Sequence, residues 1–145
     1  MATVDRTFTV TPPPAVVLDY LKDFAHAEEW DPGTESCTPE TPGPAQVGSR
    51  WHNESKIAGV STELTYRLER LTDSEVVFVG ENDSASTSDT ITVTPHGTGS
   101  EISYHAEIEA KGVAGKLADP VMKLLFERIG SKTEKQMTEV LNRLA

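Results

Sequence analysis

The feature that most constrains the fold is a run of strand-like segments through the middle of the chain. Five segments alternate apolar with polar residues, and short turn signals such as AG, TDS and PHGTGS separate them. Segments joined by such short turns form hairpins, and successive hairpins form an antiparallel meander. The predicted strands cover residues 47–57, 60–71, 75–82, 86–94 and 101–110.

One face of this predicted sheet is apolar and the other is polar. Leu64, Tyr66 and Leu68 alternate with Thr and charged residues, and residues 102–108 follow the same rule. An apolar face needs an element that covers it. After Asp119-Pro120, which can begin a helix, about 24 residues carry apolar side chains at spacings of three and four. The pattern predicts a long C-terminal helix packed on the sheet.

The N-terminal third supplies one more strand and short helices. Residues 3–11 alternate as a strand, and the prolines of TPPP then open a helix that we expect to end near His26. Residues 31–48 contain seven prolines and glycines, so they hold only a short strand at about 35–38. The expected fold class is α+β.

Composition restricts the class of protein further. The chain has 145 residues, of which 37% are hydrophobic, and this suits a single domain over residues 1–145. Its net charge of -10 repels phosphate backbones, so we expect no nucleic-acid partner. With one cysteine, no secretory signal and no apolar run of about 20 residues, we expect no membrane span and a cytoplasmic location.

Three stretches of the sequence resemble one superfamily. TPPPAVVLDYLKDFAHAEEW is similar to its opening helical segment, QVGSRW to the entry of its third strand, and ELTYRLERLTD to its fourth strand. On these motifs the whole chain resembles the START-related helix-grip superfamily, SRPBCC, and its polyketide cyclase/dehydrase-like branch. The resemblance implies a curved antiparallel sheet of about seven strands wrapped around a long C-terminal helix. It also implies two short helices after the first strand and a cavity between sheet and helix.

Polar residues on the third strand are the sharpest functional hint. Trp51, Asn53 and Ser55 share one face, while the alternate positions are mostly charged and should meet solvent. An amide or hydroxyl that is buried without a partner costs about 1 to 3 kcal/mol. Asn53 and Ser55 should therefore meet a ligand, a water or a protein partner, and the sequence leaves these alternatives open.

Aromatic and helical residues complete the candidate binding set. The resemblance implies that Trp30 ends the second short helix and points inward while Glu28, Glu29 and Asp31 stay in water. Its ring would either contact a ligand or only pack the helices onto the sheet. The tyrosine hydroxyls could orient a ligand or simply reach the surface, Phe78 could face either way, and Gly130 could leave a cavity or allow close helix packing. The candidate ligand-binding residues are Trp30, Trp51, Asn53, Ser55, Tyr66, Phe78, Tyr104, Met122, Phe126 and Gly130.

No catalytic residue, cofactor or metal site is predicted. His26 with its acidic neighbours only loosely resembles a metal site, and His52 and His105 alternate outward. Since no glutamate is expected to point inward, no buried general base can be named. Cys37 lies in a proline-rich connection without an adjacent cation, which indicates an ordinary thiol.

Three functions remain open at this point. The first is binding of a hydrophobic or aromatic small molecule, lipid-like or polyketide-like, by a monomer or homodimer. The second is a polyketide cyclase/dehydratase-like enzyme in which Asn53, Ser55, Tyr66 and Tyr104 position a polyketone. The third is a protein-interaction or regulatory module, which the polar outer faces support little.

Overall fold

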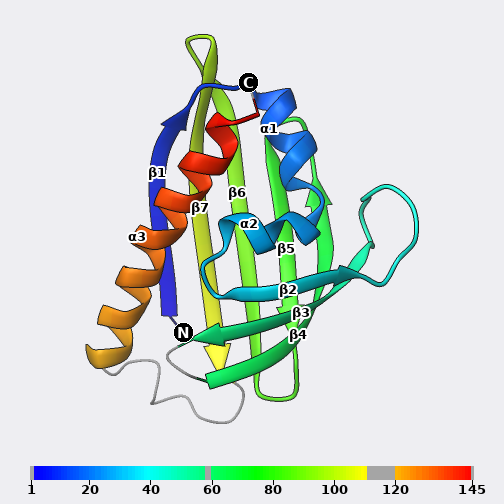
Figure 1. The fold of residues 1–145 in the computed structure, drawn as a ribbon, viewed down its shortest axis with the longest axis vertical. Helices are drawn as coiled ribbons and strands as arrows, with labels where there is room; N and C mark the ends of the chain where they lie inside the picture. Colours follow the sequence, from blue (N-terminus) through cyan, green and yellow to red (C-terminus); the bar gives the residue numbers. More distant parts are fainter. Residues whose placement is uncertain (1, 58–59, 111–119, 145) are drawn as a thin grey trace.

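The computed structural model describes residues 2–57, 60–110 and 120–144. A first strand and three short helical segments precede a run of six strands, and one long helix follows (Figure 1). The elements in chain order are β1 (Ala2–Val10), α1 (Pro14–Leu21), the 3₁₀ helix η1 (Phe24–His26), α2 (Ala27–Trp30), β2 (Thr34–Pro39), β3 (Arg50–Ile57), β4 (Val60–Leu71), β5 (Glu75–Glu81), β6 (Ala85–His96), β7 (Gly99–Ala110) and α3 (Pro120–Asn142).

The seven strands form one antiparallel sheet in the order β1-β7-β6-β5-β4-β3-β2. Strands β2 to β7 follow one another as a meander, and β1 closes the sheet by pairing with β7, where Val4 lies opposite Ala106. The sheet is strongly curved, because β2, β3 and β4 run across the view in Figure 1 while β1, β6 and β7 run along it. All three labelled helices lie in front of it in this view. The predicted α+β helix-grip fold is confirmed.

The first helical segment is shorter than predicted. Pro14 begins α1, whose Val17, Leu18 and Leu21 are buried, and α1 ends at Leu21 instead of continuing to His26. The reason is Asp23, whose side chain accepts a hydrogen bond from Ala25 N at 3.1 Å and so begins the separate turn η1. The segment η1 passes directly into α2, which ends at Trp30 as predicted.

Helix α3 packs most closely against β1. A Cβ added to Gly130 would lie 2.7 Å from Val4 Cγ1 and 3.1 Å from Arg6 Cζ, so only glycine allows this approach. Arg6 fixes the same contact, because its Nη2 donates to Glu127 Oε2 at 2.9 Å and to Glu127 O at 3.0 Å. Of the two readings of Gly130, close helix packing is therefore the one observed.

An aromatic cluster fills the part of the interior under η1 and α2. Phe24 lies at its centre, with ring-centre distances of 4.2 Å to Tyr66, 4.5 Å to Phe78 and 5.9 Å to Trp30. Trp51 joins it at 6.3 Å from Phe24. These five residues are all buried, so Phe78 points inward and this half of the core is closely packed.

Candidate functional site

A cavity remains between the inner face of the sheet and α3, beside the aromatic cluster. Its volume is about 90 Å³, which is well above the roughly 10 to 15 Å³ that a cavity needs in order to hold one water. Most of the wall is apolar, and two carboxyl groups, two phenols and several hydroxyls point into it. The lining residues are Val4, Asp31, Gly33, Ser55, Thr62, Leu64, Tyr66, Thr87, Asp89, Tyr104, Ala106, Ile108, Phe126, Ile129 and Thr133.

Asp89 is the most deeply placed charged group of this cavity. It lies on β6 opposite Ala106 of β7 and is only 6% exposed. Its Oδ2 accepts a hydrogen bond from Tyr104 Oη at 3.4 Å. Burial, together with the negative charge of Asp31, raises the pKa of Asp89 to about 7, although the hydrogen bond from Tyr104 lowers it. Asp89 can therefore gain or lose a proton near neutral pH.

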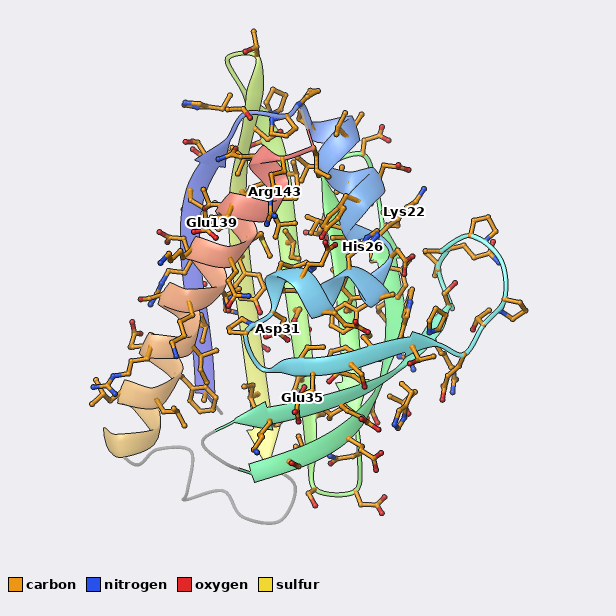
Figure 2. All side chains as sticks on the ribbon, viewed as in Figure 1. Lys22, His26, Asp31, Glu35, Glu139 and Arg143 are labelled. Atoms are coloured by element: carbon orange, nitrogen blue, oxygen red, sulfur yellow. The ribbon has the colours of Figure 1, made fainter. Side chains whose placement is uncertain are left out.

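Asp31 reaches the same cavity from the end of α2, where the chain turns into β2 (Figure 2). Its Oδ1 accepts from Gly33 N at 3.0 Å and its Oδ2 from Thr34 Oγ1 at 2.8 Å. Burial raises the pKa of Asp31, and these two hydrogen bonds oppose the rise. The expectation that Asp31 stays in water was wrong, because the two bonds fold the turn back on itself and bring its carboxyl group to the cavity wall. Its neighbours Glu28 and Glu29 are exposed as expected.

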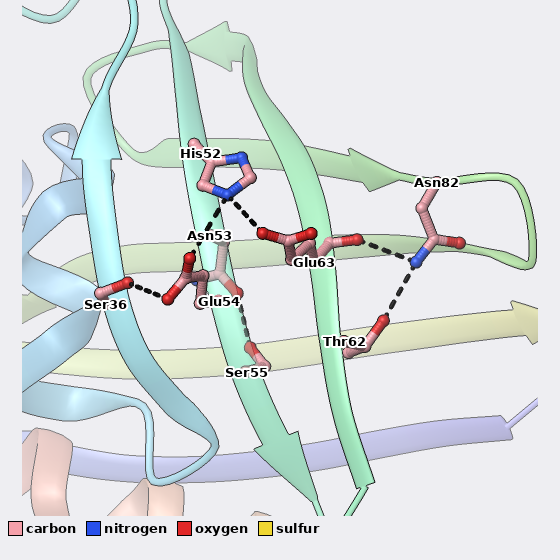
Figure 3. A network of polar contacts seen from close by, with 8 residues as sticks. All are labelled: Ser36, His52, Asn53, Glu54, Ser55, Thr62, Glu63 and Asn82. Carbon is pink, nitrogen blue, oxygen red and sulfur yellow. Dashed lines mark hydrogen bonds and ion pairs between the residues drawn. The ribbon is translucent and has the colours of Figure 1, made fainter.

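A chain of hydrogen bonds connects Asp31 to the third strand. Thr34, which donates to Asp31, accepts from Asn53 Nδ2 at 3.1 Å. Asn53 Oδ1 in turn accepts from Ser55 Oγ at 2.5 Å, and Figure 3 shows this second bond. Asn53 is fully buried and has protein partners, so it supports the wall without lining it. Ser55 does line it. The predicted inward face of this strand, including Trp51, is confirmed.

Tyr66 and Tyr104 both keep their hydroxyls inside instead of reaching the surface. Thr87 Oγ1 donates to Tyr66 Oη at 3.2 Å, and Tyr104 donates to Asp89. Gly80 makes space for Tyr66, because a Cβ there would lie 2.7 Å from Tyr66 Cζ. Burial raises the pKa of each phenol well above its usual range, so both stay protonated and can donate hydrogen bonds.

The other predicted binding residues lie in three different places. Phe126 lines the cavity from α3. Trp30, Trp51 and Phe78 belong to the aromatic cluster and not to the lining, so for Trp30 the packing alternative is the one observed. Gly130 lies against β1, as described above. At the start of α3, the predicted N-cap Asp119 and the side chain of Met122 lie outside the described residues.

The sequence reasoning missed both carboxyl groups, and Asp89 overturns the conclusion that no buried general base could be named. The signal for Asp89 was available. Ile91 and Val93 are buried at alternate positions of β6, and two steps back along the same face lead to Asp89 and Thr87. No comparable periodic signal exists for Asp31, which lies in a turn.

The outer face of the sheet carries a group that could hold a metal ion. His52, Glu54 and Glu63 offer one ligand atom each, all within 4.8 Å of one another. His52 Nε2 is 3.1 Å from Glu63 Oε1 and 3.8 Å from Glu54 Oε1 (Figure 3). Exposed acidic groups commonly lie this close together without an ion, and the hydrogen-bond contact between His52 and Glu63 explains the arrangement. These side chains point away from the cavity, as predicted for His52.

His26, His105 and Cys37 take part in packing and surface pairing. His26 stacks on Tyr20 with ring centres 4.1 Å apart, and its Nδ1 lies 2.7 Å from Tyr20 O. His105 lies between Glu107 and Asp5, whose hydrogen bonds raise its pKa, on the outer face as predicted. Burial raises the pKa of Cys37 to about 12, so its thiol stays protonated.

Comparison with known proteins extends this description. A family described as "Polyketide cyclase / dehydrase and lipid transport" matches residues 1–145. A START superfamily protein from Mycobacterium smegmatis has a similar structure, with a TM-score of 0.81, 14% identity and full coverage of both chains. The Zhui aromatase/cyclase from Streptomyces sp. R1128 has a TM-score of 0.73 at 17% identity, over 98% of this chain and 92% of that one.

No curated protein sequence matches the chain significantly. In the described part of the chain, no helix is both long and apolar enough to cross a membrane.

Proposed function

Because the chain belongs to the polyketide cyclase/dehydrase and lipid transport family, we propose that it binds a small hydrophobic or aromatic molecule between the sheet and α3. The observation that carries this proposal is the cavity itself. Apolar side chains such as Leu64, Ala106 and Phe126 form most of its wall, and a few polar groups, including Asp89 and Tyr104, converge on it. This combination is the usual composition of a small-molecule site.

The size of the cavity favours a ligand with a single ring. A volume of about 90 Å³ is well below the roughly 300 to 1,000 Å³ of sites that enclose drug-sized ligands. The same space suits one aromatic ring with a short substituent better than a fused polyketide or a long acyl chain. Phe126 and Tyr104 offer flat surfaces for such a ring.

Filling the cavity should abolish ligand binding. Ala106 lies on β7 and is 7% exposed, so the larger side chain of Ala106→Leu would occupy the space with little strain. We expect the affinity for 2-phenylethanol, measured by ligand-observed NMR, to fall at least ten-fold. Ala15→Leu makes the same change on the exposed side of α1 and should bind like the unmodified protein. Equal binding by both variants would place the ligand elsewhere.

Asp89 supports a second candidate function, catalysis in the same cavity. A carboxyl group whose burial raises its pKa to about 7 is suited to act as a general base at neutral pH. Its carboxylate could remove a proton from the carbon beside a ketone, and the electron pair would move to the ketone oxygen. Tyr104 or Tyr66 could then donate a hydrogen bond to the resulting enolate, because both phenols stay protonated.

Exchange of carbon-bound protons in heavy water tests this second candidate. Benzoylacetone exchanges the protons between its two carbonyl groups, and we expect the protein to accelerate the exchange. General-base catalysis typically contributes a factor of about 100 or more, so Asp89→Asn should lower the protein-catalysed rate by about that factor. An NMR time course gives the rate. The same rate in Asp89→Asn would exclude Asp89 as the base.

The proposed partner is therefore a small molecule, bound by a cytoplasmic monomer or homodimer. The single cysteine, Cys37, is free and buried, which suits a reducing compartment. The net charge of -10 disfavours nucleic acid. A protein-interaction role has less support, because the exposed large apolar side chains among the described residues are Val16 on α1, Val47 before β3 and Leu124 on α3.

A further inference from the structure

The charged groups in the cavity wall all have the same sign. Asp31 and Asp89 line it, and no lysine, arginine or histidine is among the described lining residues. The whole chain adds to this negative field with its net charge of -10. A cavity built to hold the carboxylate of a fatty acid or an aromatic acid would need a cation or several hydrogen-bond donors at this place.

The two carboxyl groups differ in how well their oxygens are satisfied. Both oxygens of Asp31 accept hydrogen bonds at 3.0 Å or less, from Gly33 and Thr34. Asp89, in the described part of the chain, receives one hydrogen bond, and at 3.4 Å from Tyr104 it is long for a bond between two oxygens. Its Oδ1 accepts no hydrogen bond from the described residues, and it is not among the fully buried atoms that lack a partner. Asp89 therefore keeps unused capacity to accept hydrogen bonds, and it faces the cavity.

We propose that the cavity selects a small aromatic amine, whose ammonium group pairs with Asp89, and that it rejects aromatic carboxylates. This inference rests on the proposed binding function and names the ligand class of that site. An ammonium group supplies both a positive charge and three N–H donors, which are the two things that a buried carboxylate lacks here. The ring would lie against the apolar wall formed by α3 and β7.

The pH dependence of binding follows from the groups that face Asp89. These are Tyr66 from β4, Tyr104 from β7 and Asp31 from the turn after α2, while α3 contributes no ionisable group to the described lining. Both phenols stay neutral. Burial raises the pKa of Asp89 to about 7, and an aliphatic ammonium keeps its charge up to about pH 9 to 10. Affinity for an amine should therefore rise from pH 6 to pH 8, and affinity for a carboxylate should fall.

Three probes of matched shape test the proposal: 2-phenylethylamine, 2-phenylethanol and phenylacetate. Calorimetric titration at pH 8 should give an amine affinity at least ten-fold above that of the alcohol, with phenylacetate at least ten-fold below it. Since the ionised fraction of Asp89 is about ten-fold smaller at pH 6 than at pH 8, amine affinity should fall about ten-fold at pH 6. The alcohol should change little.

Two variants assign the preference to one residue. Asp89→Asn should bring the amine to within about three-fold of the alcohol. Asp83→Asn removes the same charge from the exposed turn between β5 and β6 and should keep the preference. If Asp89→Asn does not fold, the pH series on the unmodified protein decides alone.

The results separate a failure of the proposed amine preference from a failure of the proposed binding function. An alcohol that binds in the cavity without any preference for the amine would overturn this inference and leave the proposed function intact. If phenylacetate binds as tightly as the amine, this inference is likewise overturned and the proposed function is left intact. If none of the three probes binds, the inference fails together with the proposal of a ligand with a single ring.

Discussion

Replacing Trp30 by alanine is expected to lower the free energy of unfolding by about 3 to 5 kcal/mol. Its side chain is fully buried, and it meets Phe24 edge-on at 5.9 Å and Tyr104 at 6.2 Å between ring centres. Alanine would leave a hole between α2 and the sheet that the surrounding rings are too rigid to refill. Denaturation by urea, with the midpoint and slope compared between variants, measures the loss.

The matched variant Trp30→Phe separates packing from hydrogen bonding. Trp30 Nε1 is the one buried side-chain nitrogen or oxygen in the described residues that has no hydrogen-bond partner. Phenylalanine therefore removes no hydrogen bond, and we expect it to cost less than about 2 kcal/mol. A cost for Trp30→Phe as large as that for Trp30→Ala would contradict this view. A decrease of less than about 1 kcal/mol in the free energy of unfolding of Trp30→Ala would also contradict it.

Replacing Asp89 by asparagine is expected to stabilise the protein at alkaline pH. Burial raises the pKa of Asp89 from its ordinary 3.8 to about 7, so the folded state holds this proton more tightly than the unfolded state. The contribution of Asp89 to stability is therefore fully present below about pH 3.8 and is lost as the pH rises through 7. Asparagine has a similar shape, can still accept from Tyr104, and does not ionise.

The size of this stabilisation follows from the same difference in proton binding between the folded and the unfolded state. Between pH 5 and pH 8, ionisation of Asp89 should lower the free energy of unfolding by about 2 to 3 kcal/mol. The gain from Asp89→Asn should accordingly be larger at pH 8 than at pH 5 by that amount, measured by urea denaturation at both pH values. Asp83→Asn, at an exposed position, should change little at either pH. An equal gain from Asp89→Asn at both pH values would show that burial does not raise the pKa of Asp89 into this range.

These two predictions describe opposite contributions to the interior. Trp30 helps to stabilise the fold, whereas Asp89 destabilises it whenever it is ionised. A carboxyl group with this cost, facing a cavity and lacking a cation among the described residues, is what a binding site for an amine or a catalytic base requires. The aromatic cluster closes one part of the interior, and the adjacent cavity is left for function.

Most of the fold could be predicted from the sequence because local periodicity determines it. Strand β4 begins and ends at the predicted residues, Val60 and Leu71. A single rule predicted which face of β3 points inward: its charged residues, at alternate positions, meet solvent. Even Gly130 was interpretable, since a glycine inside an amphipathic helix needs a reason such as the close approach to β1.

The site was harder to predict because its key residues depend on how the chain packs and turns. The alternation that places Tyr66 inward does not distinguish a closely packed aromatic cluster from a cavity wall, and Tyr66 belongs to both. Trp51 and Phe78, predicted as ligand contacts from their strands, lie in this cluster. Trp30, which the resemblance had placed beside the cavity, lies there too. Asp31 depends on a turn of two hydrogen bonds, and acidic residues in turns are usually solvated.

An NMR titration of the Asp89 side-chain carboxyl carbon, with and without 2-phenylethylamine, tests directly whether this buried carboxyl group ionises near neutral pH and pairs with an amine. We expect a midpoint near pH 7 for the free protein. In the presence of the amine the midpoint should be lower, because the positive charge of the ammonium group favours the carboxylate. A midpoint near pH 4 that the amine leaves unchanged would contradict both expectations.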